Sequence, residues 1–289
     1  MLGVTAFSFT VPFTHVAVET LSPVFVGAGR AVVAAVLAAI ALAVTRQPLP
    51  TRRQGARLVV VAAGVVVGFP MLTSLALTST AASHGAVVIA LLPAATAVAA
   101  VVRGRERPSR AFWVAAALGA LAAIVFATLN GGGISPLQGA DVLLLAAVVA
   151  AAVGYAEGGM LSRELGSWQT VSWALVLSSP LTIALTAGSA LIAPPTAPLE
   201  GWLALAYLSV ISMFLGFFAW YRGLAIGPMA QVSQVQLVQP VLTLVWAALI
   251  LHESITALTV IGGVAVIACA GLAVRTRAKP RAKAPGGAR

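Results

Sequence analysis

Residues 238–274 read VQPVLTLVWAALILHESITALTVIGGVAVIACAGLAV, and residues 91–126 read LLPAATAVAAVVRGRERPSRAFWVAAALGALAAIVF. Both stretches carry a proline in an apolar run and a glutamate 13 residues later, Pro93 with Glu106 and Pro240 with Glu253. One offset of 147 residues superimposes the two pairs. A duplicated hydrophobic unit interrupted by proline is typical of transporters, which bind their substrates between the repeats. The sequence therefore predicts a carrier built from two copies of one unit.

The composition places the chain in a bilayer. Of its 289 residues 60% are apolar and only 8% are charged, whereas about a quarter of the residues of soluble domains are charged. A transmembrane helix needs about 20 mainly apolar residues. Stretches of about this length run over 2–18, 23–45, 58–77, 83–102, 111–129, 142–160, 168–192, 201–221, 229–251 and 255–274. The expected fold is an all-α polytopic membrane protein with ten transmembrane helices.

The two halves are expected to be inverted repeats. Each holds five helices, and because five is odd, the second copy enters the membrane in the opposite sense to the first. We predict a first repeat over 1–130, a second over 139–275 and a basic tail over 276–289. The first segment, with no basic residues before it, is expected to be a membrane helix and not a cleaved signal peptide.

The basic residues predict the orientation. If the N-terminus is cytoplasmic, the connections on that side and the C-terminal tail hold all the Lys and Arg except Arg30, which lies inside the second helix. The positive-inside rule then places both termini in the cytoplasm, for a protein of the bacterial inner (plasma) membrane. A basic tail could bind nucleic acid, but spaced charges after a last span favour anchoring to anionic lipid. We therefore expect the bilayer as a partner and no nucleic acid.

The C-terminal stretch resembles EamA-type members of the drug/metabolite transporter superfamily. In that family a proline-bearing helix runs into a glutamate, and a glycine-bearing last helix follows, here with Gly262, Gly263 and Gly271. Arg30 resembles a basic residue that the family often has in its second helix. The resemblance implies export of amino acids, other metabolites or drugs, and most closely suggests a bacterial exporter of amino acids, including aromatic ones. Related four-helix multidrug members rely on a glutamate in the middle of helix 1, which this chain lacks.

The first helix carries a polar stripe. Spacings of three and four residues place on one face Thr5, Ser8, Pro12, His15 and Glu19. Polar side chains on one stripe of a membrane helix normally face the bundle or a wet cavity. Ser8 and His15 are therefore candidates for substrate binding, although Ser and Thr also serve as ordinary contacts between helices. Glu19 is expected near the outer mouth.

The ninth helix begins with four amides, Gln231, Gln234, Gln236 and Gln239, and polar groups in hydrocarbon need partners. At 100° per residue Gln231 and Gln234 share a face, whereas Gln236 points elsewhere. We interpret Gln231 and Gln234 as substrate ligands or structural groups, and Gln236 as mainly structural. His84 is the repeat mate of Gln231, so it either lines the pathway or is a satisfied interior histidine.

Two charged residues within the spans are candidates for coupling or gating. Glu157 lies opposite Pro12 at an offset of 145 residues, two fewer than that of the Pro–Glu pairs, and is the natural candidate for proton coupling, because desolvation favours the protonated form. The alternative is a position near the cytoplasmic interface, where it meets Arg163 or water. The long side chain of Arg30 can extend to the interface or pair with Glu19.

The predicted substrate site lies at mid-membrane between the halves, on helices 1, 3, 4, 6, 8 and 9. Tyr155 and Trp220 would supply an apolar wall, although aromatic residues near helix ends also form interfacial belts. Pro12, Pro93 and Pro240 are either hinges for alternating access or static kinks.

Other functional classes fit less well. Asp141 is the only aspartate, and the chain has no His-Glu-x-x-His motif and no phosphate-binding glycine loop, so an enzyme is not expected. We expect no cofactor and no metal, a small-molecule substrate, and a monomer. A channel usually shows a filter or a charged ring. An uncoupled facilitator or a lipid flippase remains the alternative.

Overall fold

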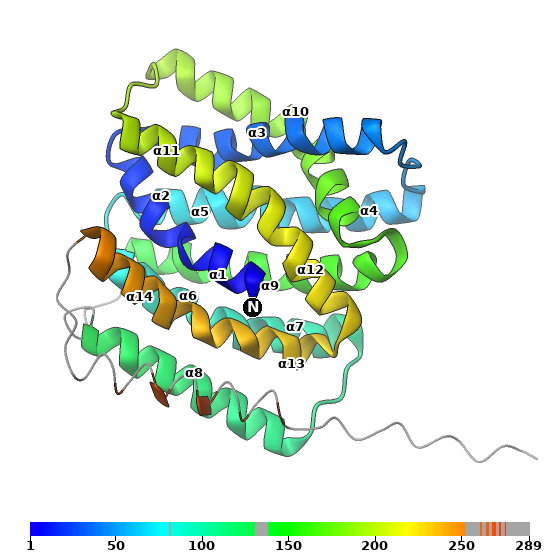
Figure 1. Ribbon diagram of the computed structural model, residues 1–289, viewed down its shortest axis with the longest axis vertical. Helices are drawn as coiled ribbons and strands as arrows, with labels where there is room; N and C mark the ends of the chain where they lie inside the picture. The colour runs from blue at the N-terminus through cyan, green and yellow to red at the C-terminus, as the bar shows by residue number, and fades with distance from the viewer. Residues whose placement is uncertain are drawn as a thin grey trace, which may run out of the picture.

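The computed structural model describes residues 1–80, 82–130 and 138–251, together with positions 261, 264, 265, 268, 269, 272 and 275. In these residues every regular element is helical, and the helices lie beside one another as tilted rods (Figure 1). The elements of the first half are α1 (Leu2–Ser8), α2 (Thr10–Val18), α3 (Pro23–Val44), α4 (Arg52–Val61), η1 (Ala62–Gly68), α5 (Phe69–Ala76), α6 (Ala82–Ile89), α7 (Leu92–Gly104) and α8 (Arg110–Asn130). Those of the second half are α9 (Gly139–Leu165), α10 (Ser167–Ile192), α11 (Leu199–Tyr207), η2 (Leu208–Leu215), α12 (Gly216–Ile226), α13 (Met229–Gln234), η3 (Val235–Leu237) and α14 (Val238–Leu251).

These elements overlap, over the described ranges, the first nine predicted spans. Among the described residues, five helices are long and apolar enough to cross a membrane: Pro23–Val44, Arg52–Ala76, Gly139–Leu165, Ser167–Ile192 and Leu199–Ile226. Shorter apolar helices run over Leu2–Val18, Leu92–Gly104 and Arg110–Ala122. The tenth predicted span, 255–274, lies almost wholly outside the described residues, and the number ten stays a prediction.

Local sequence signals explain where the helices begin and end. Ser22 is the N-cap of α3, where its Oγ accepts a hydrogen bond from the backbone N–H of Phe25, and a proline follows at the first helical position. Thr51 and Gln54 form a capping box at the start of α4. Between α9 and α10 only Gly166 intervenes, at φ +96°, a conformation that glycine adopts without strain.

The same irregularities recur in both halves at the repeat offset. The π-helical stretch η1 begins at Ala62, and its counterpart η2 begins at Leu208, 146 residues later. The short helices α6 and α13 begin at Ala82 and Met229, 147 residues apart. A π-helical stretch in an α-helix is rare and often marks a functional site. These matches support two copies of one unit.

Helix α9 is the central rod of the bundle. It packs against α4, η1, α5 and α7 of the first half and against α10 and α12 of the second. Glycines allow the closest of these contacts: a Cβ added at Gly158 would lie 2.3 Å from Cζ of Tyr221, and one added at Gly64 of η1 would lie 2.4 Å from the carbonyl oxygen of Ala150. Small residues let membrane helices approach closely. The space that Gly158 leaves is filled by the Tyr221 ring.

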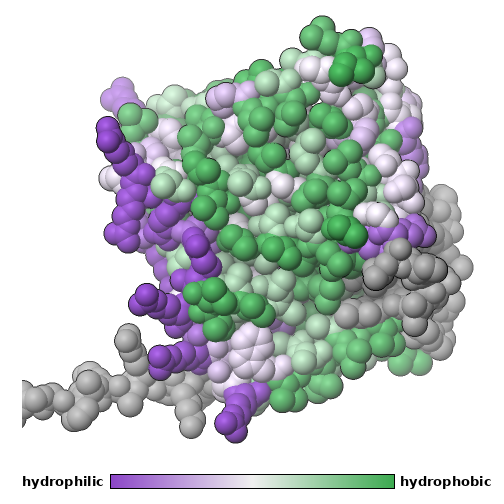
Figure 2. Space-filling view, turned by 180° about the vertical axis from the view of Figure 1, so that it is seen from behind, coloured by the Kyte–Doolittle hydropathy of each residue, from purple (hydrophilic) through white to green (hydrophobic). Residues whose placement is uncertain are grey.

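Charged and apolar surfaces are segregated. Figure 2 shows hydrophilic side chains along one edge of the molecule and hydrophobic side chains over the face between the edges. Large apolar side chains that are exposed include those of Val36, Ile40, Leu118 and Leu181. At one end of the bundle, helices α4, α8 and α13 begin and helices α3, α7, α9 and α12 stop. We call this the basic end, because many of the arginines lie there: Arg46, Arg52, Arg53, Arg57, Arg103, Arg105, Arg107, Arg163 and Arg222.

Candidate functional site

A central cavity lies between the two halves of the chain. Its empty volume is about 450 Å³, a figure that includes space open to solvent. Both π-helical stretches contribute to its wall. The lining residues are Phe7, Thr10, Val11, Arg30, Val65, Phe69, Pro70, Leu92, Ala151, Tyr155, Ser212, Met213, Phe217, Gln236 and Gln239.

One side of the cavity is aromatic. The rings of Phe7 and Phe217 are 4.9 Å apart between centroids, and the ring of Tyr155 lies 6.0 Å from that of Phe217 at a steep angle. Trp220 supports this wall through an edge contact with Tyr155 at 5.4 Å. Edge-to-face and tilted pairs of this kind are the favoured arrangements of aromatic rings. The wall suits an apolar or aromatic ligand.

The polar groups of the cavity are mostly paired with one another. The hydroxyls of Thr10 and Ser212 lie 2.8 Å apart and share a hydrogen bond. Nε2 of Gln236 donates to Oε1 of Gln239 at 3.1 Å, and Nε2 of Gln239 donates to the carbonyl oxygen of Phe7 at 3.3 Å. The Oε1 atom of Gln236 has no hydrogen-bonding partner among the described residues. A smaller adjacent cavity of about 240 Å³ shares Val11, Gln236 and Gln239.

Arg30 is the charged residue in this wall. It lies seven residues into α3, about 10 Å along the helix from Pro23, and it is 1% exposed. Its Nε and Nη2 atoms have no hydrogen-bonding partner within the described part of the chain. The structure therefore contradicts both sequence interpretations of Arg30. The side chain does not extend to the interface, and Glu19 instead lies beside His15, 3.3 Å from Nδ1, with its side chain 60% exposed.

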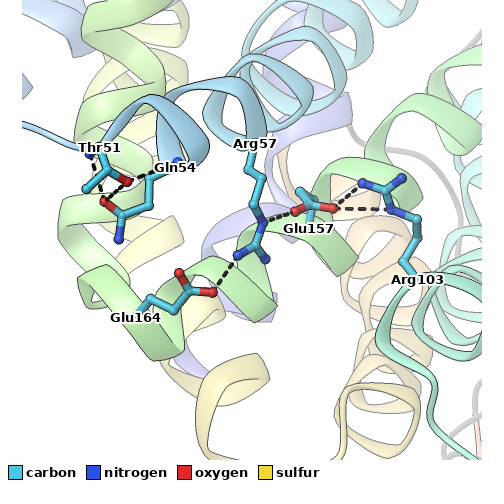
Figure 3. Close-up of polar contacts among 6 residues, drawn as sticks. All are labelled: Thr51, Gln54, Arg57, Arg103, Glu157 and Glu164. Atoms are coloured by element: carbon cyan, nitrogen blue, oxygen red, sulfur yellow. Dashed lines mark hydrogen bonds and ion pairs between the residues drawn. The ribbon is translucent and has the colours of Figure 1, made fainter.

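A cluster of four charged residues lies toward the basic end (Figure 3). The Oε1 atom of Glu157 accepts a hydrogen bond from Nε of Arg57, and Oε2 accepts from Nε of Arg103 at 3.2 Å and from its Nη2. Nη1 of Arg57 also donates to Glu164. Glu157 is 1% exposed, so two guanidinium groups stabilise its buried negative charge. The cluster joins α4, α7 and α9.

The neighbour that the sequence suggested for Glu157 has other partners. Arg163 donates to the backbone carbonyls of Leu224, Ala225 and Gly227, at the end of α12. A cation at the C-terminal end of a helix is stabilising, because the unpaired carbonyls carry partial negative charge.

The first landmark glutamate joins the two halves. Helix α7 ends at Gly104, and Arg105 follows in the left-handed conformation at φ +52°, which turns the chain so that Glu106 faces α13. The carboxylate of Glu106 accepts hydrogen bonds from the backbone N–H groups of Met229 at 2.7 Å and Ala230 at 2.9 Å. It thus satisfies two donors of the first turn of α13. Glu253, its repeat mate, lies outside the described residues.

The other predicted substrate ligands on the ninth span lie away from the cavity lining. Nε2 of Gln234 donates to the carbonyl oxygen of Pro93 at 3.2 Å, and the hydroxyl of Ser233 donates to the same oxygen at 3.2 Å. Gln231 is half-buried in the first turns of α13, close to the basic end. His84 belongs to α6, and its side chain lies outside the described part of the structure. For these residues substrate binding stays a prediction.

Residues predicted on the first span are divided between packing and surface. The hydroxyl of Ser8 donates to the carbonyl of Thr5 and accepts from Nε1 of Trp246 at 2.8 Å. Pro12 is buried in α2, and His15 is partly exposed beside Glu19. On the ninth span, Pro240 lines the smaller cavity. Of the predicted site residues, Tyr155 and Arg30 are those that the structure brings together in the larger cavity.

Several lining residues escaped the sequence patterns. Thr10 was missed because the stripe argument assumed one straight helix, whereas α1 ends at Ser8 and α2 begins at Thr10. Phe7, Phe69 and Phe217 are apolar residues in apolar spans, which carry no signal of their own. No sequence pattern links Ser212 with Thr10, and their hydrogen bond across the repeats follows only from the three-dimensional arrangement.

Comparison with known proteins agrees with this architecture. The profile of the EamA-like transporter family matches twice, over residues 1–128 and 138–275. The uncharacterized transporter YdeK of Bacillus subtilis (strain 168) is 46% identical over 274 residues, covering 95% of each chain. A protein of known crystal structure superimposes with a TM-score of 0.71 over 94% of each chain. At 19% identity, this last likeness concerns the fold alone.

Proposed function

Because the chain belongs to the EamA-like transporter family and is a multi-pass membrane transporter, we propose that it exports amino acids, aromatic ones included, or related small metabolites or drugs. Transport proceeds by alternating access, with the central cavity as the substrate site. The proposed location is the bacterial inner membrane, with both termini and the basic end in the cytoplasm. The protein acts as a carrier and not as an enzyme, and a monomer suffices because the cavity is formed within one chain.

The central cavity is the observation that carries this proposal. It is lined from both repeats: Thr10 and Arg30 come from the first, Tyr155 and Ser212 from the second. Substrate sites of transporters with inverted repeats lie near mid-membrane at the repeat interface, where helices are interrupted. Here the walls include both π-helical stretches and the break between α1 and α2.

The ends of the cavity region differ in chemistry, which supports two separate gates. Toward the basic end stands the Arg57, Glu157, Arg103 and Glu164 cluster. We propose that this cluster closes the cytoplasmic gate, and that the gate opens when the ion pairs of Glu157 with Arg57 and Arg103 break. Leaving Glu157 buried without them would favour protonation, which gives Glu157 a route to proton coupling.

Toward the other end the contacts are aromatic. The rings of Phe9 and Trp246 stack at 4.4 Å, and Phe13 meets Tyr207 edge-on at 4.8 Å. These four side chains come from both repeats. Aromatic contacts can part without leaving an unpaired charge, so they suit an outer gate. Pro93 and Pro240 begin or interrupt helices beside the cavity and are proposed hinges.

Flux through purified protein in liposomes tests the proposal. Vesicles loaded with amino acids, aromatic ones first, should show saturable flux that responds to an imposed pH gradient. Tyr155→Ala should reduce that flux strongly, whereas Phe112→Ala, which removes an equally buried ring outside the cavity, should retain it per folded molecule. Saturable flux without a response to pH would identify the uncoupled facilitator. Movement of lipid analogues alone would identify a flippase, and no protein-dependent flux of any compound would contradict transport through this cavity.

A further inference from the structure

The larger cavity contains an unbalanced positive charge. Among its described lining residues Arg30 is the only one with a charged side chain, and the rest are apolar, hydroxyl or amide groups. Arginine stays protonated in proteins. A buried charge without a partner is costly in a membrane protein and commonly marks a functional site.

Every described carboxylate either has another partner or is exposed at the surface. Glu157 and Glu164 bind arginines, Glu106 caps α13, and Asp141 accepts the backbone N–H of Gln138 at the start of α9. Glu19 and Glu200 are exposed. None of these groups lines the cavity. The described wall therefore offers nothing that balances the charge of Arg30, and nothing that balances the charge of a ligand ammonium group.

The two free donors of Arg30 form one edge of the guanidinium. Nε and Nη2 lie on the same side of the planar group, so their N–H bonds point in nearly parallel directions. This edge matches the two oxygens of a carboxylate in a bidentate pair, the strongest common arrangement for arginine. The remaining unpaired acceptor of the lining, Oε1 of Gln236, is neutral. It can accept a hydrogen bond from a ligand hydroxyl or amine but does not compensate a charge.

We propose that the cavity selects small organic monoanions, namely a carboxylate on an aromatic or branched apolar body, with Arg30 as the anion-binding residue. This rests on the proposed function and narrows its substrate class. The carboxylate lies on the Arg30 edge, and the apolar body lies against Phe7, Tyr155 and Phe217. A zwitterionic amino acid with the same body binds more weakly, because its ammonium group finds no negative charge in the wall. A purely cationic amine is excluded by repulsion from Arg30.

A matched ligand series tests the selectivity directly. Binding to the purified protein in lipid nanodiscs is measured by calorimetry for 3-phenylpropanoate, phenylalanine and phenethylamine, which share one skeleton and differ in charge. The sulfonate 3-phenylpropanesulfonate stays charged at all working pH values and removes any contribution from a neutral acid. The expected order of affinity is anion above zwitterion, with no binding of the amine. Tighter binding of phenylalanine or phenethylamine than of both anions would overturn the proposal.

Substitutions of Arg30 separate charge from geometry. Arg30→Gln should weaken binding of 3-phenylpropanoate by about 10- to 100-fold, as expected for loss of a charged hydrogen-bonded pair. Arg30→Lys keeps the charge without the bidentate edge and should retain intermediate affinity. Arg53→Gln, an exposed basic residue at the basic end, should bind like the unchanged protein. Thermal unfolding of each variant verifies the fold, and unchanged anion affinity in a folded Arg30→Gln protein would contradict the assignment.

The proposed transport function and this selectivity fail in different ways. Saturable flux of some compound with no preference for anions would support the transport proposal and contradict the anion-binding role of Arg30. Anion binding that depends on Arg30, without protein-dependent flux, would support the anion-binding site and contradict the transport proposal.

Discussion

The Oε1 atom of Glu106 lies 2.7 Å from the backbone nitrogen of Met229 and accepts its hydrogen bond. This contact joins the end of α7 in the first half to the first turn of α13 in the second. The second carboxylate oxygen of Glu106 accepts a hydrogen bond from the next backbone N–H, so both oxygens bind donors of the helix. A landmark that is conspicuous in the sequence for its spacing is thus a structural connection between the halves.

Replacing Glu106 should therefore destabilise the protein. Glu106→Ala removes the cap from two backbone donors and should cost about 0.5–2 kcal/mol, the usual range for a helix N-cap. Glu106→Gln keeps one acceptor oxygen and should cost less. Thermal unfolding in detergent measures both, with the exposed Glu19→Gln as a control. Equal unfolding temperatures for Glu106→Ala and the unchanged protein would argue against a capping role.

The charged cluster predicts that Glu157 and Arg57 act as a unit. Each single variant, Glu157→Gln and Arg57→Gln, removes one charge of the pair and leaves its partner with one ion-pair contact fewer, whereas the double variant removes both charges. The double variant should unfold at a temperature higher than additivity of the two single effects predicts. Additive losses would show that the two side chains are energetically independent.

Proton coupling makes a separate prediction for Glu157. Glu157→Gln should abolish accumulation driven by a pH gradient while leaving exchange of substrate between the two sides of the membrane. The measurement is counterflow and gradient-driven uptake in the same liposomes. Gradient-driven accumulation that survives at the original rate would make Glu157 a structural residue only.

Affinity measurements distinguish the sequence-based site from the cavity. Gln239→Ala should weaken apparent substrate affinity by about 2- to 13-fold, equivalent to one neutral hydrogen bond of about 0.5–1.5 kcal/mol. Gln234→Ala, which loses the contact with the carbonyl of Pro93, should lower stability more than affinity. The opposite pattern, with affinity lost in Gln234→Ala and retained in Gln239→Ala, would favour the site that the helical spacing predicts.

The glycine contacts of α9 predict a sharp difference between two Gly→Ala variants. At Gly158 a Cβ would lie 2.3 Å from Cζ of Tyr221, so Gly158→Ala should displace that buried ring and lower the yield of folded protein. At Gly188 of α10 a Cβ meets nothing within 4 Å. Gly188→Ala should be tolerated or slightly stabilising, because alanine favours helix more than glycine. Size-exclusion chromatography and thermal unfolding compare the two, and equal behaviour would contradict tight packing of α9 on α12.

The sequence predicts the architecture better than the site, for identifiable reasons. Apolar length locates most of the described helices to within a few residues, because the bilayer requires about 20 apolar residues in each span. The site depends on which helix face borders the cavity: the rule of about 100° per residue separates Gln236 from Gln231 and Gln234, but the sequence does not show that the face of Gln236 is the one that lines the cavity. Arg57 and Glu157 are 100 residues apart, and no periodic pattern links them.

The central position of α9 also has a consequence for biosynthesis. Arg57 and Arg103 are synthesised before the carboxylate of Glu157 that binds them, and Glu106 is synthesised before the backbone amides of α13. Until then these arginines lack Glu157, and anionic lipid headgroups attract basic side chains near the membrane surface. Insertion of α9 then exchanges lipid for protein partners. A chain that ends before α9 should therefore lack the carboxylate that joins α4 to α7, because the second half supplies it.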